Sequence, residues 1–240
     1  MLTPMNAPTV SVVMPCFNEE AAVCTTIERA HRALERLAAG HEILVVDDGS
    51  ADRTGAVVRE RFGADPRVRV LTHERNRGLG AAISTGMAAA TQELIVTLCA
   101  DGQFDPEEYA AFLDARATGD LVIGYRVTRA EAGRRTIVSS VYRRVIRVLF
   151  GLTVRDPGWI KMFRRADVPK LKTSSEGFFW ETEVLVRARD AGLTIAEVPV
   201  HSFARQGGEA KGAQLWRIVE AVKRALTFWW NHRVLKGGAA

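Results

Sequence analysis

The sequence of 240 residues has little cysteine, no long apolar run and no signal peptide pattern. Its three cysteines, Cys16, Cys24 and Cys99, form no Cys-x-x-Cys pair. This spacing argues against a disulfide scaffold or a structural zinc site and favours a reducing compartment. No window approaches the ~20 uninterrupted apolar residues of a membrane-spanning helix. The first nine residues lack the basic and apolar regions of a signal peptide. We therefore expect a cytoplasmic protein that is soluble or at most bound to a membrane surface.

The chain also lacks a large excess of charge of either sign. Lys and Arg number 33 against 28 Asp and Glu, which leaves a net charge of +5. This value is mild for a nucleic-acid-binding protein, so we expect no nucleic-acid partner, but it suits an anionic substrate or an anionic membrane surface. With 47% apolar and 25% charged residues, the chain is long enough for one large globular domain or two small ones.

Short apolar runs alternate with helix-like segments along the first half of the chain. The apolar runs are residues 10–14, 42–46, 68–71, 94–98 and 121–123. The helix-like segments are residues 19–39, 53–62, 80–91 and 106–117. This alternation predicts an α/β fold with a mainly parallel central sheet and helices on both faces. Such sheets bind ligands at the carboxyl ends of their strands, so the residues after each run are the candidates for a site.

Polar and acidic residues follow three of these runs. Residues 18–20 follow the first, Asp47 and Asp48 close the second, and residues 101–103 follow the fourth. Single residues of these types commonly cap helices or shape turns. Carboxylates crowded at one edge repel each other unless a cation or a hydrogen-bond donor lies among them. The three groups together therefore favour a binding site.

The sequence motifs at these positions point to a known family. The segments 11–20, 43–50, 76–80 and 100–103 read SVVMPCFNEE, ILVVDDGS, NRGLG and ADGQ. In this order they resemble glycosyltransferase family 2, and more narrowly its dolichyl-phosphate mannose synthase-like branch. The resemblance extends from about residue 10 to residue 211. It implies a GT-A (Rossmann-like) fold and an inverting hexosyltransferase that uses a GDP- or UDP-linked sugar, a divalent cation and often a polyprenyl phosphate acceptor of the dolichyl or undecaprenyl type.

The resemblance assigns donor-binding roles to residues of the first two motifs. Pro15, Phe17 and Glu19 match the loop that holds the base and ribose of the nucleotide sugar. Phe17 stands where the family usually has tyrosine, so a ring remains for stacking but the phenolic hydroxyl is missing. Asp47 matches an acid that contacts the base or ribose, and its alternative role is that of a turn acid before Gly49.

The resemblance also implies a site for Mg²⁺ or Mn²⁺ at Asp101 and Gln103, both of which also face the donor. The family has an Asp-x-Asp motif with Gln two residues later, and here Cys99 replaces the first acid. A thiolate is a soft ligand and substitutes poorly for a carboxylate toward Mg²⁺. Hard cations accept one or two carboxylates completed by phosphate and water, so we expect Asp101 with Gln103 and the diphosphate to suffice.

On the acceptor side, the resemblance identifies cations and one acid. Arg126 matches a family arginine, and its planar guanidinium suits phosphate oxygens. Arg205 and Lys211 bracket a glycine-rich loop similar to one that closes over the donor phosphates. Glu183 matches an acid on the acceptor side, with Glu181 as a nearby candidate. We expect Asp101, Arg126 and Glu183 to be catalytic, although an ionised phosphate acceptor needs no general base.

Two segments have the composition of membrane-surface helices. Residues 136–152 place apolar residues on one helical face and Arg143, Arg144 and Arg147 on the other, and residues 226–236 combine adjacent indoles with cations. Each segment is also compatible with an ordinary surface helix. We expect peripheral association with the inner membrane face, directly or through a membrane-protein partner. The expected organisation is an N-terminal tail (1–9), a GT-A domain (10–212) and a C-terminal amphipathic helix (213–240).

Three other interpretations remain open. A saccharide, lipid or small-molecule hydroxyl acceptor requires a general base, for which Glu183 or Glu181 is available. A nucleotidyltransferase would have a glycine-rich, lysine-bearing loop after the first strand, and residues 15–20 contain no such loop. A catalytically silent nucleotide-sugar binding protein is the non-enzyme alternative, and Cys99 is the residue that motivates it.

Overall fold

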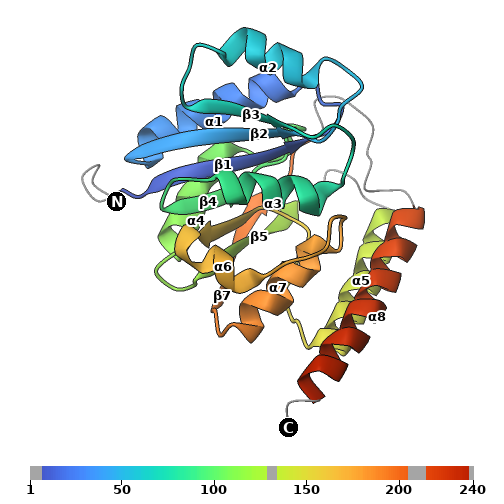
Figure 1. The fold of residues 1–240 in the computed structure, drawn as a ribbon. Coiled ribbons are helices and arrows are strands. Elements are labelled where there is room, and N and C mark those ends of the chain that lie inside the picture. The colour runs from blue at the N-terminus through green and yellow to red at the C-terminus, as the bar shows by residue number, and fades with distance from the viewer. Residues whose placement is uncertain (1–6, 129–133, 205–214, 238–240) are drawn as a thin grey trace.

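The structure of the chain is a computed structural model that describes residues 7–128, 134–204 and 215–237, and the side chains within 7–127, 141–204 and 220–231. Seven strands form one sheet in the order β3-β2-β1-β4-β6-β5-β7 (Figure 1). The strands are β1 (Thr9–Cys16), β2 (Gly40–Asp47), β3 (Val68–Thr72), β4 (Leu94–Thr97), β5 (Leu121–Thr128), β6 (Lys161–Arg164) and β7 (Ile195–His201). The pairs β1–β2, β1–β4, β2–β3 and β5–β7 are parallel, whereas β6 is antiparallel to both β4 and β5.

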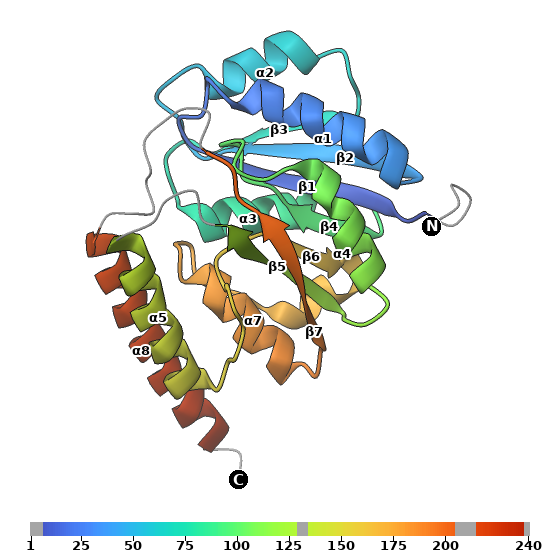
Figure 2. The same ribbon diagram turned by 180° about the vertical axis from the view of Figure 1, so that it is seen from behind.

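Helices cover both faces of this sheet. They are α1 (Val23–Leu37), α2 (Thr54–Phe62), α3 (Leu79–Ala89), α4 (Tyr109–Ala115), α5 (Arg134–Phe150), α6 (Val168–Leu171), α7 (Trp180–Asp190) and α8 (Leu215–Gly237), with short 3₁₀ turns at Pro106–Glu108 and Arg165–Asp167. Helices α1 and α4 lie on one face, and α3 and α7 lie on the other (Figure 2). The expected α/β fold with a mainly parallel sheet is confirmed.

The apolar runs form strands because alternate side chains are buried on opposite faces. In β1, Val12 and Met14 join the core under α1 and α4, and Val13 joins the core under α3 and α7. In β2, Ile43 joins the core under α1 and α4, and Leu44 joins the core under α3 and α7. A parallel strand covered on both faces is a continuous apolar run, which is the pattern that the sequence showed. All five predicted strands are present, and the structure adds β6 and β7.

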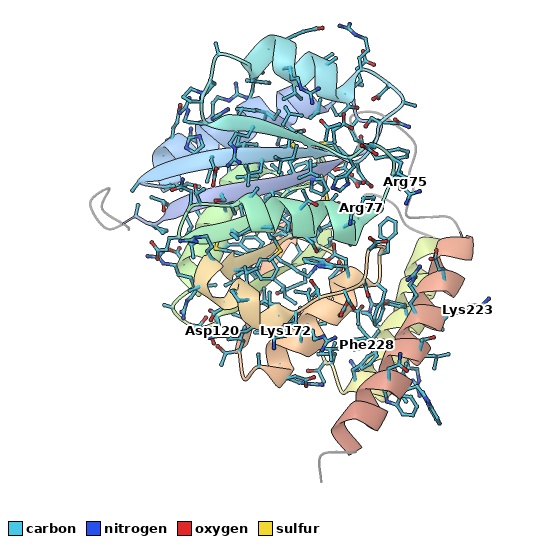
Figure 3. All side chains as sticks on the ribbon, viewed as in Figure 1. Arg75, Arg77, Asp120, Lys172, Lys223 and Phe228 are labelled. Carbon is cyan, nitrogen blue, oxygen red and sulfur yellow. The ribbon has the colours of Figure 1, made fainter. Side chains whose placement is uncertain are left out.

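Helices α5 and α8 run side by side at one flank of the sheet (Figure 1). Ile146 and Phe150 of α5, with Ala225 of α8, join the core under α7, and Phe228 of α8 packs on it (Figure 3). The sequence predicted one apolar face for α5, but Val141 and Val148 from that face are 57% and 76% exposed. The apolar arc of α5 is therefore wider than its contact with the core. The division of the chain at residue 212 stays a prediction.

None of the helices in the described ranges combines the length and apolar character needed to cross a bilayer.

Candidate functional site

A cavity of about 480 Å³ lies at the carboxyl edge of the sheet, where the sequence predicted a site. It is bounded by the ends of β1, β4 and β5, by the loop that opens α3, by the segment before α7, and by α8. Of the predicted site residues, it brings together Pro15, Phe17, Glu19, Asp101, Gln103 and Arg126.

The loop after β1 is fixed by hydrogen bonds to the segment after β2. Asn18 has a positive φ of 54°, and its side-chain oxygen accepts a hydrogen bond from the Ala51 N–H at 2.8 Å. The Asn18 N–H donates to Ser50 Oγ at 3.0 Å, and the Glu19 N–H donates to Thr54 Oγ1 at 2.8 Å. These bonds hold Phe17 and Glu19 in the cavity wall.

The two consecutive acids at the end of β2, Asp47 and Asp48, have different surroundings. Asp47 lies outside the cavity lining, and its Oδ1 accepts a hydrogen bond from the Ser50 N–H at 3.0 Å. Asp48 lines the cavity and accepts hydrogen bonds from the backbone N–H groups of Arg77 and Gly78. Asp47 thus occupies the turn position predicted as its alternative role. Asp48, which the sequence analysis grouped with the strand-end acids without a role of its own, lines the cavity.

Asp101 and Gln103 lie together at the end of β4. Asp101 is buried, and its Oδ1 accepts a hydrogen bond from the Gln103 N–H at 3.0 Å across Gly102, which has a positive φ of 72°. The Gln103 carbonyl accepts from the Phe203 N–H at 2.9 Å, and its Nε2 donates to the Phe203 carbonyl at 3.4 Å. The segment that directly follows β7 is thereby tied to the loop after β4.

These residues are compatible with a hard divalent cation, provided that other ligands come from a bound molecule. Asp101 offers carboxylate oxygen and Gln103 offers amide oxygen in one cavity wall. Cys99 lines the same wall with sulfur in place of the second carboxylate. Within the described part of the chain, no three His, Cys, Asp or Glu side chains form a cluster that holds a metal on its own. Mg²⁺ commonly takes one or two carboxylates and completes its shell with phosphate and water.

Arg126 at the end of β5 is held rigidly beside the cavity. Its Nη1 donates to Asp156 Oδ2 at 2.7 Å, and its guanidinium carbon lies 3.6 Å from the centroid of a Trp159 ring. Nη2 donates to the Gly158 carbonyl at 3.4 Å. Stacking and ion pairing fix the orientation of the planar guanidinium, which is the geometry needed to recognise an anion.

Glu181 lines the cavity and pairs with a buried lysine. Lys161 is 1% exposed, and its ammonium donates to the carbonyls of Pro157 at 2.7 Å and Trp159 at 3.0 Å and to the Glu181 carboxylate. Burial raises the pKa of Glu181, and the Lys161 ammonium opposes that rise. The structure thus distinguishes the two acids between which the sequence left the choice open.

Glu183 lies outside the cavity lining and is fully buried. Its carboxylate accepts hydrogen bonds from the Ser174 and Ser175 N–H groups at 3.1 and 2.8 Å, and Arg187 lies one helical turn away at 3.4 Å. The segment held by these hydrogen bonds leads directly into residues 176–179, which line the cavity. The geometry therefore gives Glu183 a supporting position behind the cavity wall.

The cavity also includes residues of α8, which the sequence analysis did not assign to a site. Glu220, Ala221 and Arg224 line it, and Arg224 Nε pairs with Glu220 Oε1 at 3.1 Å. Their place in the lining depends on tertiary packing of α8, which no local motif indicates. Arg205 and Lys211 lie outside the described residues.

Comparisons with known proteins agree with this geometry. A family model described as "Glycosyl transferase family 2" matches residues 11–172. The polyprenol monophosphomannose synthase of Mycolicibacterium smegmatis is 33% identical over 214 residues, which cover 83% of this chain and 79% of that protein. The undecaprenyl-phosphate 4-deoxy-4-formamido-L-arabinose transferase of Sodalis glossinidius is 31% identical over 214 residues, which cover 88% of this chain and 65% of that protein.

Solved structures show the same fold. Glucosyl-3-phosphoglycerate synthase from Mycobacterium tuberculosis, in complex with Mn²⁺, UDP and glucosyl-3-phosphoglycerate, matches with a TM-score of 0.74 at 23% identity, covering 94% of this chain and 81% of that chain. The same enzyme in complex with Mg²⁺ and UDP matches with a TM-score of 0.69 at 20% identity, covering 92% and 80%. The expected GT-A fold is therefore confirmed.

Proposed function

The chain belongs to glycosyl transferase family 2, and we propose that it is an inverting hexosyltransferase that moves a sugar from a GDP- or UDP-linked donor to a polyprenyl phosphate of the dolichyl or undecaprenyl type. The names of two relatives, a polyprenol monophosphomannose synthase and an undecaprenyl-phosphate sugar transferase, support this acceptor class. The observation that carries the proposal is one cavity with Asp101 and Gln103 in one wall and an oriented Arg126 in another.

The donor occupies the part of the cavity near β1 in this proposal. Pro15, Phe17 and Glu19 hold the base and ribose, and Phe17 offers a ring for stacking. Asp47 supports this loop through its bond to Ser50. The diphosphate lies between Asp101 and the loop that opens α3. Arg205 and Lys211 complete the donor site as the family resemblance implies.

Asp101 and Gln103 would hold Mg²⁺ or Mn²⁺ against the donor diphosphate. A bound divalent cation stabilises the negative charge that develops on the leaving diphosphate. Asp101 is oriented for this role by the Gln103 N–H, which fixes one carboxylate oxygen. The replacement of the first motif acid by Cys99 makes the binding of the cation depend more on the phosphates of the donor.

Arg126 binds the acceptor phosphate and orients it for direct displacement at the anomeric carbon. A phosphate monoester is already ionised near neutral pH, so this nucleophile needs no general base. The ion pair between Glu181 and Lys161 supports this proposal, because Glu181, a cavity-lining acid close enough to feel the charge of Arg126, is already engaged with a buried ammonium. Glu183 contributes indirectly by holding residues 174 and 175.

A lipid-linked acceptor places the reaction at a membrane surface, and we expect peripheral binding at the inner face. The 17 residues of α5 include five arginines and no acid, and α8 has five Lys or Arg and one acid, Glu220. These helices carry a net charge of +9, and the remaining chain carries −4. On them Val148, Leu226 and Trp230 are exposed, and Lys223 extends away from the sheet (Figure 3). Basic and aromatic residues of this kind favour anionic headgroups.

A hydroxyl acceptor is the second candidate, because Glu181 lines the cavity and its pKa is raised by burial. A carboxylate with a raised pKa is a stronger base and is therefore better suited to take a proton from a sugar hydroxyl. In this alternative Lys161 would release Glu181 during the reaction. Glu183 does not compete for this role, since it is fully buried behind the wall.

The test is a transfer assay with a panel of GDP- and UDP-sugars, with and without Mn²⁺ and with and without a polyprenyl phosphate, followed by mass spectrometry of the lipid fraction. We expect a glycosylated polyprenyl phosphate that forms only when all three components are present. Transfer to a saccharide alone would favour the hydroxyl acceptor. Binding of a nucleotide sugar without transfer or hydrolysis would indicate a silent binding protein.

A further inference from the structure

The backbone of residues 76–78, which line the donor side of the cavity, is held by the buried carboxylate of Asp48. Asp48 is 3% exposed and follows β2. Its Oδ1 accepts a hydrogen bond from the Arg77 N–H at 2.9 Å, and its Oδ2 accepts one from the Gly78 N–H at 2.8 Å. Both N–H groups precede the first turn of α3, whose N-cap residue, Gly78, has no side-chain cap of its own. Asp48 therefore caps this loop from a neighbouring strand.

Close backbone contacts leave residues 76–78 little room to move. Gly78 has a positive φ of 99°, and a Cβ there would lie 2.7 Å from the Glu176 carbonyl oxygen. Gly49 has a φ of 69°, and a Cβ there would overlap the backbone of Arg75. Arg75 and Arg77 mark the course of the loop in Figure 3. Because backbone meets backbone on two sides, a small shift of residues 76–78 changes the shape of the cavity wall.

His73 supplies a third hydrogen bond to Asp48. Its Nδ1 lies 2.6 Å from Asp48 Oδ1, and its Nε2 lies 2.9 Å from Thr85 Oγ1 in α3. An ionised carboxylate only accepts hydrogen bonds, so Nδ1 carries the proton that is shared with Asp48. His73 is buried, and it lies outside the cavity lining. It therefore connects the end of β2 to α3 without touching the cavity itself.

We propose that His73 is a positioning residue for the donor: through Asp48 it holds residues 76–78 in the arrangement that receives the diphosphate of the nucleotide sugar. This inference rests on the proposed function for the identity of the ligand. Loss of the His73 N–H leaves a buried carboxylate with one donor fewer and lets it turn away from the loop. Binding of the donor is then weakened, while the reaction of the bound donor is little changed, because His73 touches none of the reacting groups.

The experiment measures the affinity for UDP and for GDP, each with Mn²⁺, by isothermal titration calorimetry. His73→Phe removes both hydrogen bonds of the imidazole. His73→Asn keeps an N–H near the position of Nδ1, and Thr85→Val removes only the partner of Nε2. The matched control is His41→Phe, since His41 is equally buried, at 9% exposure, but lies in β2 and pairs with His31 of α1.

We expect His73→Phe to raise the Kd of the nucleotide that the wild type binds by about tenfold, and Thr85→Val to raise it less. His73→Asn should restore the Kd to within about threefold of wild type, and His41→Phe should leave it unchanged. A tenfold change corresponds to about 1.4 kcal/mol of binding free energy. A general loss of stability lowers the fraction of active protein without changing Kd, so this pattern separates positioning from folding.

Hydrogen–deuterium exchange of the peptide that contains residues 77 and 78 gives a second, ligand-free readout. We expect at least tenfold faster exchange in His73→Phe, or in Thr85→Val to a smaller extent if the former does not fold, and no change in His41→Phe. Wild-type values of Kd and exchange in His73→Phe would overturn the inference, as would an equal rise of Kd in His41→Phe. If the wild type binds neither nucleotide, the proposed donor is wrong, and the exchange comparison alone decides the role of His73.

Discussion

The guanidinium carbon of Arg126 lies over a ring of the Trp159 indole, 3.6 Å from the ring centroid. Asp156 holds the same guanidinium at its edge through a bond of 2.7 Å. A cation fixed by a ring and by a carboxylate cannot turn freely, and its remaining N–H groups keep one direction. This is the arrangement expected of a group that recognises an anionic acceptor at a fixed angle to the donor.

Replacement of Arg126 by lysine tests whether the planar fork matters beyond the charge. Arg126→Lys keeps a cation but loses the stacking on Trp159 and the paired N–H donors. We expect the KM for the polyprenyl phosphate to rise at least tenfold while the KM for the nucleotide sugar changes little. Trp159→Leu should show the same pattern to a smaller extent. A rise confined to the donor KM would contradict the assignment of Arg126 to the acceptor.

The pair formed by Lys161 and Glu181 separates the two acceptor classes. Glu181→Gln removes a base but keeps the shape, so a phosphate acceptor should react with a kcat within about fivefold of wild type. A hydroxyl acceptor that needs Glu181 as its base should lose about 10²- to 10⁴-fold. Steady-state kinetics with each acceptor decides between them.

Lys161→Met tests how much the ion pair with Glu181 contributes to the stability of the fold. It leaves Glu181 buried without its ammonium partner, and breaking a buried ion pair by removing one member costs about 3–5 kcal/mol. The double variant Lys161→Met with Glu181→Gln should recover most of this loss in denaturant unfolding. Equal destabilisation of the single and double variants would show that packing around Lys161, and not the charge, causes the effect.

The two buried histidines at the opposite edge of the sheet predict acid sensitivity. His31 Nδ1 and His41 Nε2 lie 2.7 Å apart, and burial, followed by the neighbouring His31, lowers the pKa of His41 to about 4 from 6.5. The unfolded chain therefore binds a proton at a higher pH than the folded chain does. Stability from this group is complete above pH 6.5 and is lost as the pH falls to about 4, by up to about 3 kcal/mol.

Denaturant unfolding as a function of pH measures this effect. His41→Phe cannot be protonated and should show a shallower decline of the unfolding free energy between pH 6.5 and 4 than wild type. The same slope in His41→Phe and wild type would show that carboxylates, not this histidine pair, determine the acid sensitivity.

Cys99→Asp tests the effect of the missing motif acid. It restores a second carboxylate in the wall that contains Asp101, and hard cations prefer carboxylate oxygen to sulfur. We expect tighter Mg²⁺ binding in the presence of a nucleoside diphosphate, by about fivefold or more. Cys99→Ser changes the atom without adding charge and should stay near wild type. Weaker Mg²⁺ binding in Cys99→Asp would show that the side chain at position 99 does not face the cation.

The sequence predicted the parallel half of the sheet well, because its buried strands are apolar runs followed by polar residues. Family membership is confirmed, and it rests on the order of motifs that are each weak alone. Strands β6 and β7 were not predicted, since their pairing with β5 joins segments distant in the chain. Local patterns carry little information about such contacts.

In the candidate site too, local sequence patterns predict some residues and miss those whose position depends on tertiary packing. Pro15, Phe17 and Arg126 reach the cavity because they lie at or just after the carboxyl ends of strands, which the sequence reveals. The choice between Glu181 and Glu183 depends on which side of α7 faces the cavity, and that is decided by packing. The role of α8 in the lining depends on a tertiary contact, and His73 acts on the site only through Asp48.

The most direct test of the account is the thermal stability of wild type and Asp101→Asn with UDP or GDP, each with and without Mn²⁺. A ligand that binds only the folded state raises the melting temperature as its saturation increases. We predict that Mn²⁺ enhances the nucleotide-dependent rise in wild type and that Asp101→Asn abolishes this metal-dependent part while it keeps the fold. An undiminished Mn²⁺ response in Asp101→Asn would contradict the proposed cation site.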